Sequence, residues 1–157
     1  MIGPDRIGHV VIKVRDLARS RKFYTEVMGF TVMKEQPGMA FFSSGRDHHE
    51  IAVLEVGDAA PAPAPDAVGL YHIAFRLRDE AHLCAAWRTL RELGVPIQRT
   101  TDHGITLSIY FSDPDGTPLE VYCDRIPELW RKAERAKPFD MAEVLARHAP
   151  APVEAAE

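Results

Sequence analysis

A short segment near the start of the chain occurs a second time, and this internal repeat constrains the fold more than any other feature. The stretch IGHVVIKVRD begins at Ile7 and LYHIAFRLRD begins at Leu70, with histidine, arginine and aspartate at the same places in both. Each copy is followed by a helix-like stretch, a glycine and short apolar runs. Each copy therefore predicts one β-α-β-β-β module, and the chain predicts two modules in tandem.

The pattern inside each copy places the elements of these modules. Asp16 and Asp79 are positioned to cap the helices, and Gly29 and Gly94 are positioned to end them. In the first copy the spacing predicts strands at 8–14, 30–34, 39–43 and 49–56. In the second copy the repeat segment from Leu70 supplies the first strand, and the spacing predicts three more at 95–99, 106–112 and 118–123. We expect an α+β fold in which the two modules form a curved mixed sheet around a metal cavity, with helices added at the C-terminus.

Length and composition favour one domain. The chain has 157 residues, of which 46% are hydrophobic and 27% charged, as in ordinary globular proteins. We expect a single domain over 1–126 and a helical extension over 127–149, with helices at 128–136 and from Asp140 to about 148. The first module is expected over 5–56 and the second over 70–124. The proline-rich linker 57–69 cannot join a sheet, and the tail 150–157 is expected to be disordered.

Charge and targeting signals narrow the class of partner. The net charge is −4 and the basic residues form no long cluster, which argues against nucleic acid and anionic membranes. No apolar run has the length of a membrane span, no signal peptide is recognisable, and the two cysteines form no CxxC motif. We therefore expect a cytoplasmic protein that acts on a small molecule. Exposed sheet edges favour a homodimer, with its site inside one chain or shared between two.

Three residues are candidate metal ligands. His9 and His72 hold the same place in the two copies, so a pseudo-twofold arrangement of the modules would bring both imidazoles together. Glu120 lies inside an apolar strand, where an unpaired carboxylate would be costly. Two imidazoles and one carboxylate form the facial triad that leaves open positions on Fe(II), and Mn(II) or Zn(II) also accept these ligands.

The motif DPDG that precedes Glu120 predicts a tight hairpin. If its first aspartate pairs with Thr117, Tyr110 lies directly opposite Glu120 and faces the metal. The alternative is a tyrosine that only fills the sheet core. Strand alternation sends Cys123 to the face opposite Glu120, which argues against a thiolate ligand.

Two neighbouring residues, His49 and Glu50, offer different chemistries. Neighbours on a strand point to opposite faces, so without a bulge only one of them faces the cavity. His49 there would be an acid/base beside an open metal, whereas Glu50 would be a fourth protein ligand. His103, on a loop before the strand 106–112, is either a hydrogen-bonding group for a bound ligand or a solvated loop residue.

Over about residues 5–125 the sequence resembles the vicinal oxygen chelate superfamily, and most closely its type I extradiol dioxygenases. The resemblance rests on the paired repeat segments, on DHHEIAVLEV and on DHGITLSIYFSDPDGTPLEVY. Many extradiol enzymes have four such modules where this chain has two, and the glyoxalase-like pattern uses a carboxylate near Glu50 as a ligand. The implied roles are iron ligands for His9, His72 and Glu120, proton transfer for His49, and substrate contact for His103 and Tyr110.

The resemblance implies an Fe(II)-dependent, ring-cleaving oxidoreductase that acts on a catechol-type aromatic diol with O2, in aromatic compound catabolism. The sequence shows no dinucleotide fingerprint, as expected because the diol itself supplies the electrons. A metal-dependent lyase, isomerase or transferase is the alternative, with Glu50 as fourth ligand and Ni(II), Zn(II) or Co(II) as the metal. A module that binds an aromatic compound without turnover is the third possibility.

Overall fold

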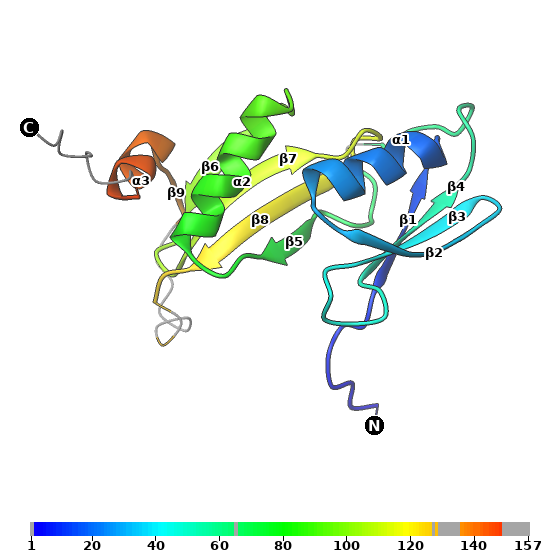
Figure 1. The fold of residues 1–157 in the computed structure, drawn as a ribbon, viewed down its shortest axis with the longest axis horizontal. Helices are drawn as coiled ribbons and strands as arrows, with labels where there is room; N and C mark the ends of the chain where they lie inside the picture. The colour runs from blue at the N-terminus through cyan, green and yellow to red at the C-terminus, as the bar shows by residue number, and fades with distance from the viewer. Residues whose placement is uncertain (1, 65, 127, 129–135, 149–157) are drawn as a thin grey trace, which may run out of the picture. The chain divides into compact units, whose positions relative to one another are not determined.

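The chain, represented by a computed structural model, is described over residues 2–64, 66–126, 128 and 136–148 (Figure 1). It has the expected α+β fold, and both copies of the repeat form a β-α-β-β-β module. The described residues divide into two compact units. Unit 1 comprises the chain up to Gly69 together with Ser112–Thr117, and unit 2 comprises Leu70–Phe111 and the chain from Pro118 onward.

Unit 1 contains a four-stranded mixed sheet. Its strand order is β1-β4-β3-β2, with β1 parallel to β4 and the other neighbours antiparallel. Because β1 and β4 are parallel, the chain must return to the same end of the sheet before β4 begins. The helical segment between β1 and β2 forms the first part of this connection. The elements in chain order are β1 (Val10–Val14), α1 (Leu17–Lys22), η1 (Phe23–Val27), β2 (Thr31–Gln36), β3 (Met39–Ser43) and β4 (Ile51–Glu55).

The helical segment begins and ends where the sequence predicts. The Asp16 side chain accepts a hydrogen bond from the Arg19 backbone N–H at 2.9 Å, which satisfies one free donor of the first turn. After Lys22 the helix widens into the π-helical turn η1. Gly29 then ends it with φ of +73°, a left-handed conformation that favours glycine.

The two faces of this sheet differ. Phe42 of β3 contacts Tyr24 of η1, with ring centroids 5.5 Å apart, so this face packs on the helical segment. Phe41 points to the other face, because neighbours on a strand alternate. There its ring lies 5.1 Å from the ring of His49. The apolar core of unit 1 therefore lies on one side of the sheet, and the predicted functional residues lie at the other.

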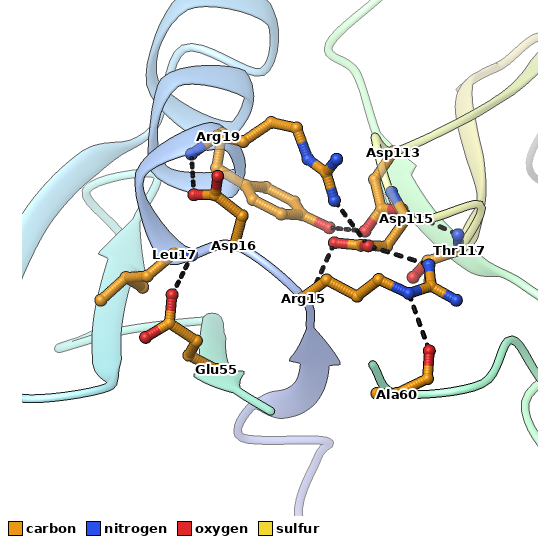
Figure 2. Close-up of polar contacts among 10 residues, drawn as sticks. Arg15, Asp16, Leu17, Arg19, Glu55, Ala60, Asp113, Asp115 and Thr117 are labelled. Atoms are coloured by element: carbon orange, nitrogen blue, oxygen red, sulfur yellow. Dashed lines mark hydrogen bonds and ion pairs between the residues drawn. The ribbon is translucent and has the colours of Figure 1, made fainter. Parts of the chain in front are cut away.

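The DPDG turn, 112–117, belongs to unit 1 although both strands that flank it belong to unit 2. Arg15 and Arg19 converge on Asp115 (Figure 2). Their guanidinium nitrogens lie 3.2 and 2.8 Å from its carboxylate. Asp113 is buried and accepts a hydrogen bond from the hydroxyl of Tyr24 at 3.1 Å. This turn is thus fixed by hydrogen bonds and ion pairs to α1, η1 and the residue that follows β1.

Unit 2 repeats the same topology and adds one strand. Its sheet has the order β5-β8-β7-β6-β9, so β5, β6, β7 and β8 correspond to β1, β2, β3 and β4. Asp79 caps α2 as predicted, and Gly94 follows the helix with φ of +68°. The elements are β5 (Ile73–Arg76), α2 (Glu80–Glu92), β6 (Arg99–Asp102), β7 (Thr106–Ser112), β8 (Pro118–Asp124), β9 (Lys137–Pro138) and α3 (Met141–Arg147).

One strand of unit 2 begins later than predicted. The expected strand at 95–99 is replaced by β6, which starts at Arg99. The backbone N–H of Val95 donates to Leu90 at 2.8 Å and so closes the end of α2, and Pro96 has no N–H to give to a sheet. The first ladder contact is the Gln98 N–H to Tyr110, so the strand cannot begin before this point.

The C-terminal helix α3 lies where Asp140 predicts it. The Asp140 side chain accepts from the Ala142 N–H at 2.9 Å, and Glu80 of α2 forms ion pairs with Arg147 and with Arg125. The expected helix at 128–136 and the tail 150–157 lie outside the described residues, apart from 128 and 136. Among the described helices, none has the length and apolar character needed to cross a membrane.

Candidate metal centre

His72 and Glu120 lie together at the β5 end of the sheet in unit 2. The parallel register places Ala74 beside Glu120. His72 is two residues before Ala74, so it shares a face with Glu120. Nε2 of His72 is 3.0 Å from Oε2 of Glu120, whose side chain is only about 10% exposed. The topology therefore brings together two of the three predicted metal ligands.

The donor set of this pair fits a divalent first-row metal, because imidazole nitrogen and carboxylate oxygen are both suitable ligands. Ligand bonds of about 2.1 Å at right angles place neighbouring donor atoms about 3 Å apart, which is the observed separation. Nδ1 of His72 is buried and has no hydrogen-bond partner among the described residues. One buried nitrogen of this pair is therefore left without a hydrogen-bond partner.

Tyr110 joins this pair through the hairpin of β7 and β8. The Asp113 N–H donates to Thr117 at one end, and the Arg125 N–H donates to Ile105 at the other. Both contacts fit one register, which puts Tyr110 directly opposite Glu120, as the DPDG motif predicts. The rings of His72 and Tyr110 meet edge to face at 5.9 Å between their centroids.

The hydroxyl of Tyr110 contacts two other predicted site residues, His103 and Glu120. Nε2 of His103 lies 3.0 Å from the hydroxyl oxygen. Burial, the charge of Glu120 and a hydrogen bond with that carboxylate raise the pKa of Tyr110, so the phenol stays protonated at neutral pH. Four predicted residues therefore form one continuous cluster in unit 2: His72, Glu120, Tyr110 and His103.

Arg99 also belongs to this cluster, although it is not among the site residues predicted from the sequence. Its guanidinium carbon lies 3.9 Å from the centroid of the Tyr110 ring. Arg99 and Tyr110 are direct partners across β6 and β7, which places the cation over the aromatic face. The sequence did not predict this contact because it depends on the register of β6. The predicted strand ended at residue 99, where the observed strand begins.

In unit 1, His49 lies beside His9. Their ring centroids are 4.5 Å apart, and the ring of His48 lies 4.4 Å from that of His49. The Nδ1 atoms of His48 and His49 are 2.6 Å apart, so one of them donates to the other. Burial and the two neighbouring imidazoles lower the pKa of His49, which favours its neutral form.

Glu50 makes different contacts. Its carboxylate accepts hydrogen bonds from both the backbone N–H, at 2.9 Å, and the hydroxyl of Ser44. Burial acts to raise the pKa of Glu50, but the hydrogen bonds from Ser44, Ser43 and Arg46 together lower it below its ordinary value. Its backbone nevertheless adjoins the start of β1, since its carbonyl accepts from the Val10 N–H at 3.0 Å. The side chain of His49 contacts His9, and that of Glu50 is held by the 43–48 loop.

The predicted site residues thus form two groups, one in each unit. Over the residues that the structure describes, no group of three or more His, Cys, Asp or Glu side chains forms a metal site. The proposed triad combines His9 of unit 1 with His72 and Glu120 of unit 2. Its assembly around one ion stays a prediction.

Comparison with known proteins identifies the family. Residues 6–121 match the model of the Glyoxalase/Bleomycin resistance protein/Dioxygenase superfamily, and the chain belongs to this superfamily. Its members are mostly metal-dependent enzymes of several kinds, dioxygenases among them. The resemblance to the vicinal oxygen chelate superfamily is therefore confirmed.

Curated relatives include proteins with different activities. The chain is 34% identical over 126 residues to a catechol-2,3-dioxygenase of Bacillus subtilis, covering 80% of this chain and 44% of that protein. It is 32% identical over 120 residues to biphenyl-2,3-diol 1,2-dioxygenase 3 of Rhodococcus globerulus, covering 76% and 63%. The chain thus spans about half to two thirds of the length of these dioxygenases. A metallothiol transferase of Staphylococcus haemolyticus is 27% identical, covering 84% and 93%.

Solved structures match this chain over most of their own length. The crystal structure of a lactoylglutathione lyase from Agrobacterium tumefaciens has a TM-score of 0.63 and 27% identity, covering 82% of this chain and 98% of that one. The shared fold therefore extends over both modules, and it occurs in relatives with different chemistry.

Proposed function

We propose that the protein is an Fe(II)-dependent extradiol dioxygenase that cleaves a catechol-type aromatic diol with O2. The observation that carries the proposal is the contact of His49 with His9, with Glu50 held by Ser44. This arrangement leaves a neutral imidazole beside a predicted ligand, as ring cleavage requires of an acid/base. The diol dioxygenases among the relatives support the same class of reaction.

His9, His72 and Glu120 would hold the metal in this proposal. One carboxylate and two neutral imidazoles would leave a divalent ion with a net charge of about +1, which attracts an ionised diol. A bound Fe(II) would supply a site at which the diol and O2 meet. Side chains of this protein would carry out the proton transfer and the contacts with the substrate.

His49 is the proposed acid/base. Its lowered pKa keeps the ring neutral near pH 7, so it can accept a phenolic proton and later return it. The contact between the Nδ1 atoms of His48 and His49 fixes the orientation of the His49 ring. His48 is exposed, whereas His49 is half-buried.

Tyr110 and His103 are the proposed substrate-contacting groups. The raised pKa of Tyr110 keeps its proton available as a hydrogen-bond donor to a developing oxyanion. His103 lies at 3.0 Å from the same hydroxyl, and Arg99 stacks on the tyrosine ring. Both contacts hold the phenol in place before a ligand binds.

A metal-dependent lyase or transferase is the second candidate, favoured by one specific observation. Extending the β1/β4 register by one residue pairs Glu50 with His9, so a rotation of the Glu50 side chain would bring its carboxylate toward that ligand. The relatives include a metallothiol transferase. In this reading Glu50 would be a fourth ligand, and the metal would be Ni(II), Zn(II) or Co(II).

Oxygen consumption tests the proposal. The purified protein is loaded with Fe(II) under anaerobic conditions and then given catechol, 3-methylcatechol or 2,3-dihydroxybiphenyl in an oxygen electrode. We expect O2 uptake and a ring-opened product with at least one of the three diols. An iron-loaded protein that consumes no O2 with any of them would contradict the dioxygenase assignment.

Two earlier expectations stay part of the proposal: a homodimer and a cytoplasmic location. The strand β2 lies at an edge of the unit 1 sheet, and five of its six residues are exposed. Such an edge can pair with a second chain. Light scattering coupled to size exclusion tests the homodimer, and cell fractionation tests the location.

A further inference from the structure

A hollow of about 420 Å³ lies on the predicted functional side of the unit 1 sheet. This volume falls within the range of about 300–1,000 Å³ that is typical of small-molecule sites. Two residues of β2, one of β3 and the loop that follows β3 surround it. The lining residues are Thr31, Met33, Ser43, Gly45, Arg46, Asp47 and His48.

The register of the sheet shows which face this hollow occupies. Thr31 is the direct partner of Ser43 across β2 and β3, so both side chains share a face. Phe41 is two residues before Ser43 and lies on that same face, where its ring contacts His49 at 5.1 Å. The hollow therefore opens on the face that carries His49, and His48 forms part of its wall.

The loop that carries Arg46 is held by hydrogen bonds. The hydroxyl of Ser43 donates to the Asp47 carbonyl at 2.6 Å and accepts from the Gly45 N–H at 2.9 Å. Gly45 has φ of +92°, a left-handed conformation that favours glycine. The Glu50 carboxylate accepts backbone N–H groups of this loop, that of Arg46 among them. The position of Arg46 at the hollow is thus fixed by the backbone around it.

One basic side chain, Arg46, and one acidic side chain, Asp47, line the hollow. Asp47, its acidic residue, already pairs with Arg6 at 2.8 Å. Within the described part of the chain, the guanidinium of Arg46 has neither an ion pair nor a hydrogen bond. Met33 is 55% exposed and gives the hollow an apolar surface against which a ring can lie. An anionic, aromatic ligand complements both features.

We propose that this hollow binds the carboxylate of an acidic aromatic diol, with Arg46 as the residue that selects it. The planar guanidinium matches a carboxylate through two parallel hydrogen bonds. The inference rests on the proposed function for the diol part of the ligand. It differs from that function in naming the substrate class, since catechol and biphenyl-2,3-diol have no carboxylate.

Turnover measurements test the selectivity. The iron-loaded enzyme is assayed with 3,4-dihydroxyphenylacetate and with 4-methylcatechol, which lacks the carboxylate. We expect kcat/KM to favour the acid by about tenfold or more, and Arg46→Met to bring the ratio of the two values close to one. Arg46→Lys keeps the charge without the planar fork and should give an intermediate ratio. Arg88→Met removes the same charge from the exposed surface of α2 and should leave the ratio unchanged.

A binding measurement separates this inference from the proposed function. Calorimetric titration with 4-hydroxyphenylacetate and with 4-methylphenol needs no turnover. We expect the acid to bind about tenfold tighter than the neutral phenol, with a difference that falls at high salt and in Arg46→Met. Equal affinity for the two phenols would overturn the inference even if catechol is cleaved. Selective binding without cleavage of any diol would instead refute the dioxygenase and leave a carboxylate site.

Discussion

Nε2 of His72 lies 3.0 Å from Oε2 of Glu120, and we propose that both side chains hold one metal ion. We expect Glu120→Gln to weaken Fe(II) binding by at least about tenfold, because the amide lacks the ligand charge. Metal content after anaerobic loading measures this. Asp124→Asn is the matched control, since it removes an equal charge from the same strand, where Asp124 pairs with Arg76. Equal iron loading of Glu120→Gln and the wild type would contradict the proposal that Glu120 is a ligand.

His49 and Glu50 make different contacts, so substituting them should affect different properties of the protein. We expect His49→Ala to bind iron normally and to lose ring cleavage by about 100-fold or more, because its proton acceptor is gone. We expect Glu50→Gln to keep both iron and measurable turnover, and to lower stability because it weakens the Ser44 contacts. Iron analysis and O2 uptake distinguish the two. Loss of metal in Glu50→Gln would favour the lyase or transferase.

The buried hydrogen bond from Tyr24 to Asp113 predicts a stability effect. Tyr24→Phe keeps the ring and removes one donor to a carboxylate that is only 5% exposed. We expect a loss of about 1–3 kcal/mol in the free energy of unfolding, measured in urea. Tyr71→Phe removes a hydroxyl from a residue that is 75% exposed and should have little effect. Similar values for both variants would show that the buried contact contributes nothing.

Glu80 predicts a pH dependence of stability. Burial acts to raise its pKa, but ion pairs and hydrogen bonds with Arg147 and His148 lower it below the ordinary value of 4.5. A lowered carboxylate pKa stabilises the fold above the unfolded pKa and loses this effect as pH falls through the folded pKa. We expect the melting temperature of Glu80→Gln to lie below that of the wild type at pH 7. The difference in melting temperature between the two proteins should disappear in acid below pH 4.5. An unchanged difference would contradict the stabilising role of the ionised Glu80 carboxylate.

The cysteines predict a simple labelling result. Burial raises the pKa of Cys123 to about 11, and Cys84 is buried in the same unit with its pKa raised for the same reason. We expect neither thiol to react with Ellman's reagent in the native protein at pH 8, and both to react in denaturant. Rapid labelling of the native protein would show that the packing of unit 2 differs from that described.

The repeat was sufficient to predict the topology of both modules. A duplicated segment implies a duplicated fold, and the sheets indeed share the orders β1-β4-β3-β2 and β5-β8-β7-β6. The helix caps Asp16 and Asp79 were predictable because they act on backbone groups only a few residues away. The hairpin that pairs Tyr110 with Glu120 follows for the same reason, since a short turn fixes its own register.

Contacts set by the exact register of a more distant strand were not predictable. The stacking of Arg99 on Tyr110 depends on where β6 begins, and the closing hydrogen bond of α2 at Val95 moved that point. The hydrogen bonds of Ser44 with Glu50 depend on the bend between β3 and β4. Strand alternation left open whether His49 or Glu50 faces the cavity. Their different contacts depend on the conformation of the 43–48 loop, which alternation does not predict.

The placement of Ser112–Thr117 in unit 1 has a consequence for any attempt to divide the chain at its linker. Here the first half depends on Asp113 and Asp115, which are encoded in the second. A gene split at the linker would therefore yield a first product that lacks these partners for Tyr24, Arg15 and Arg19.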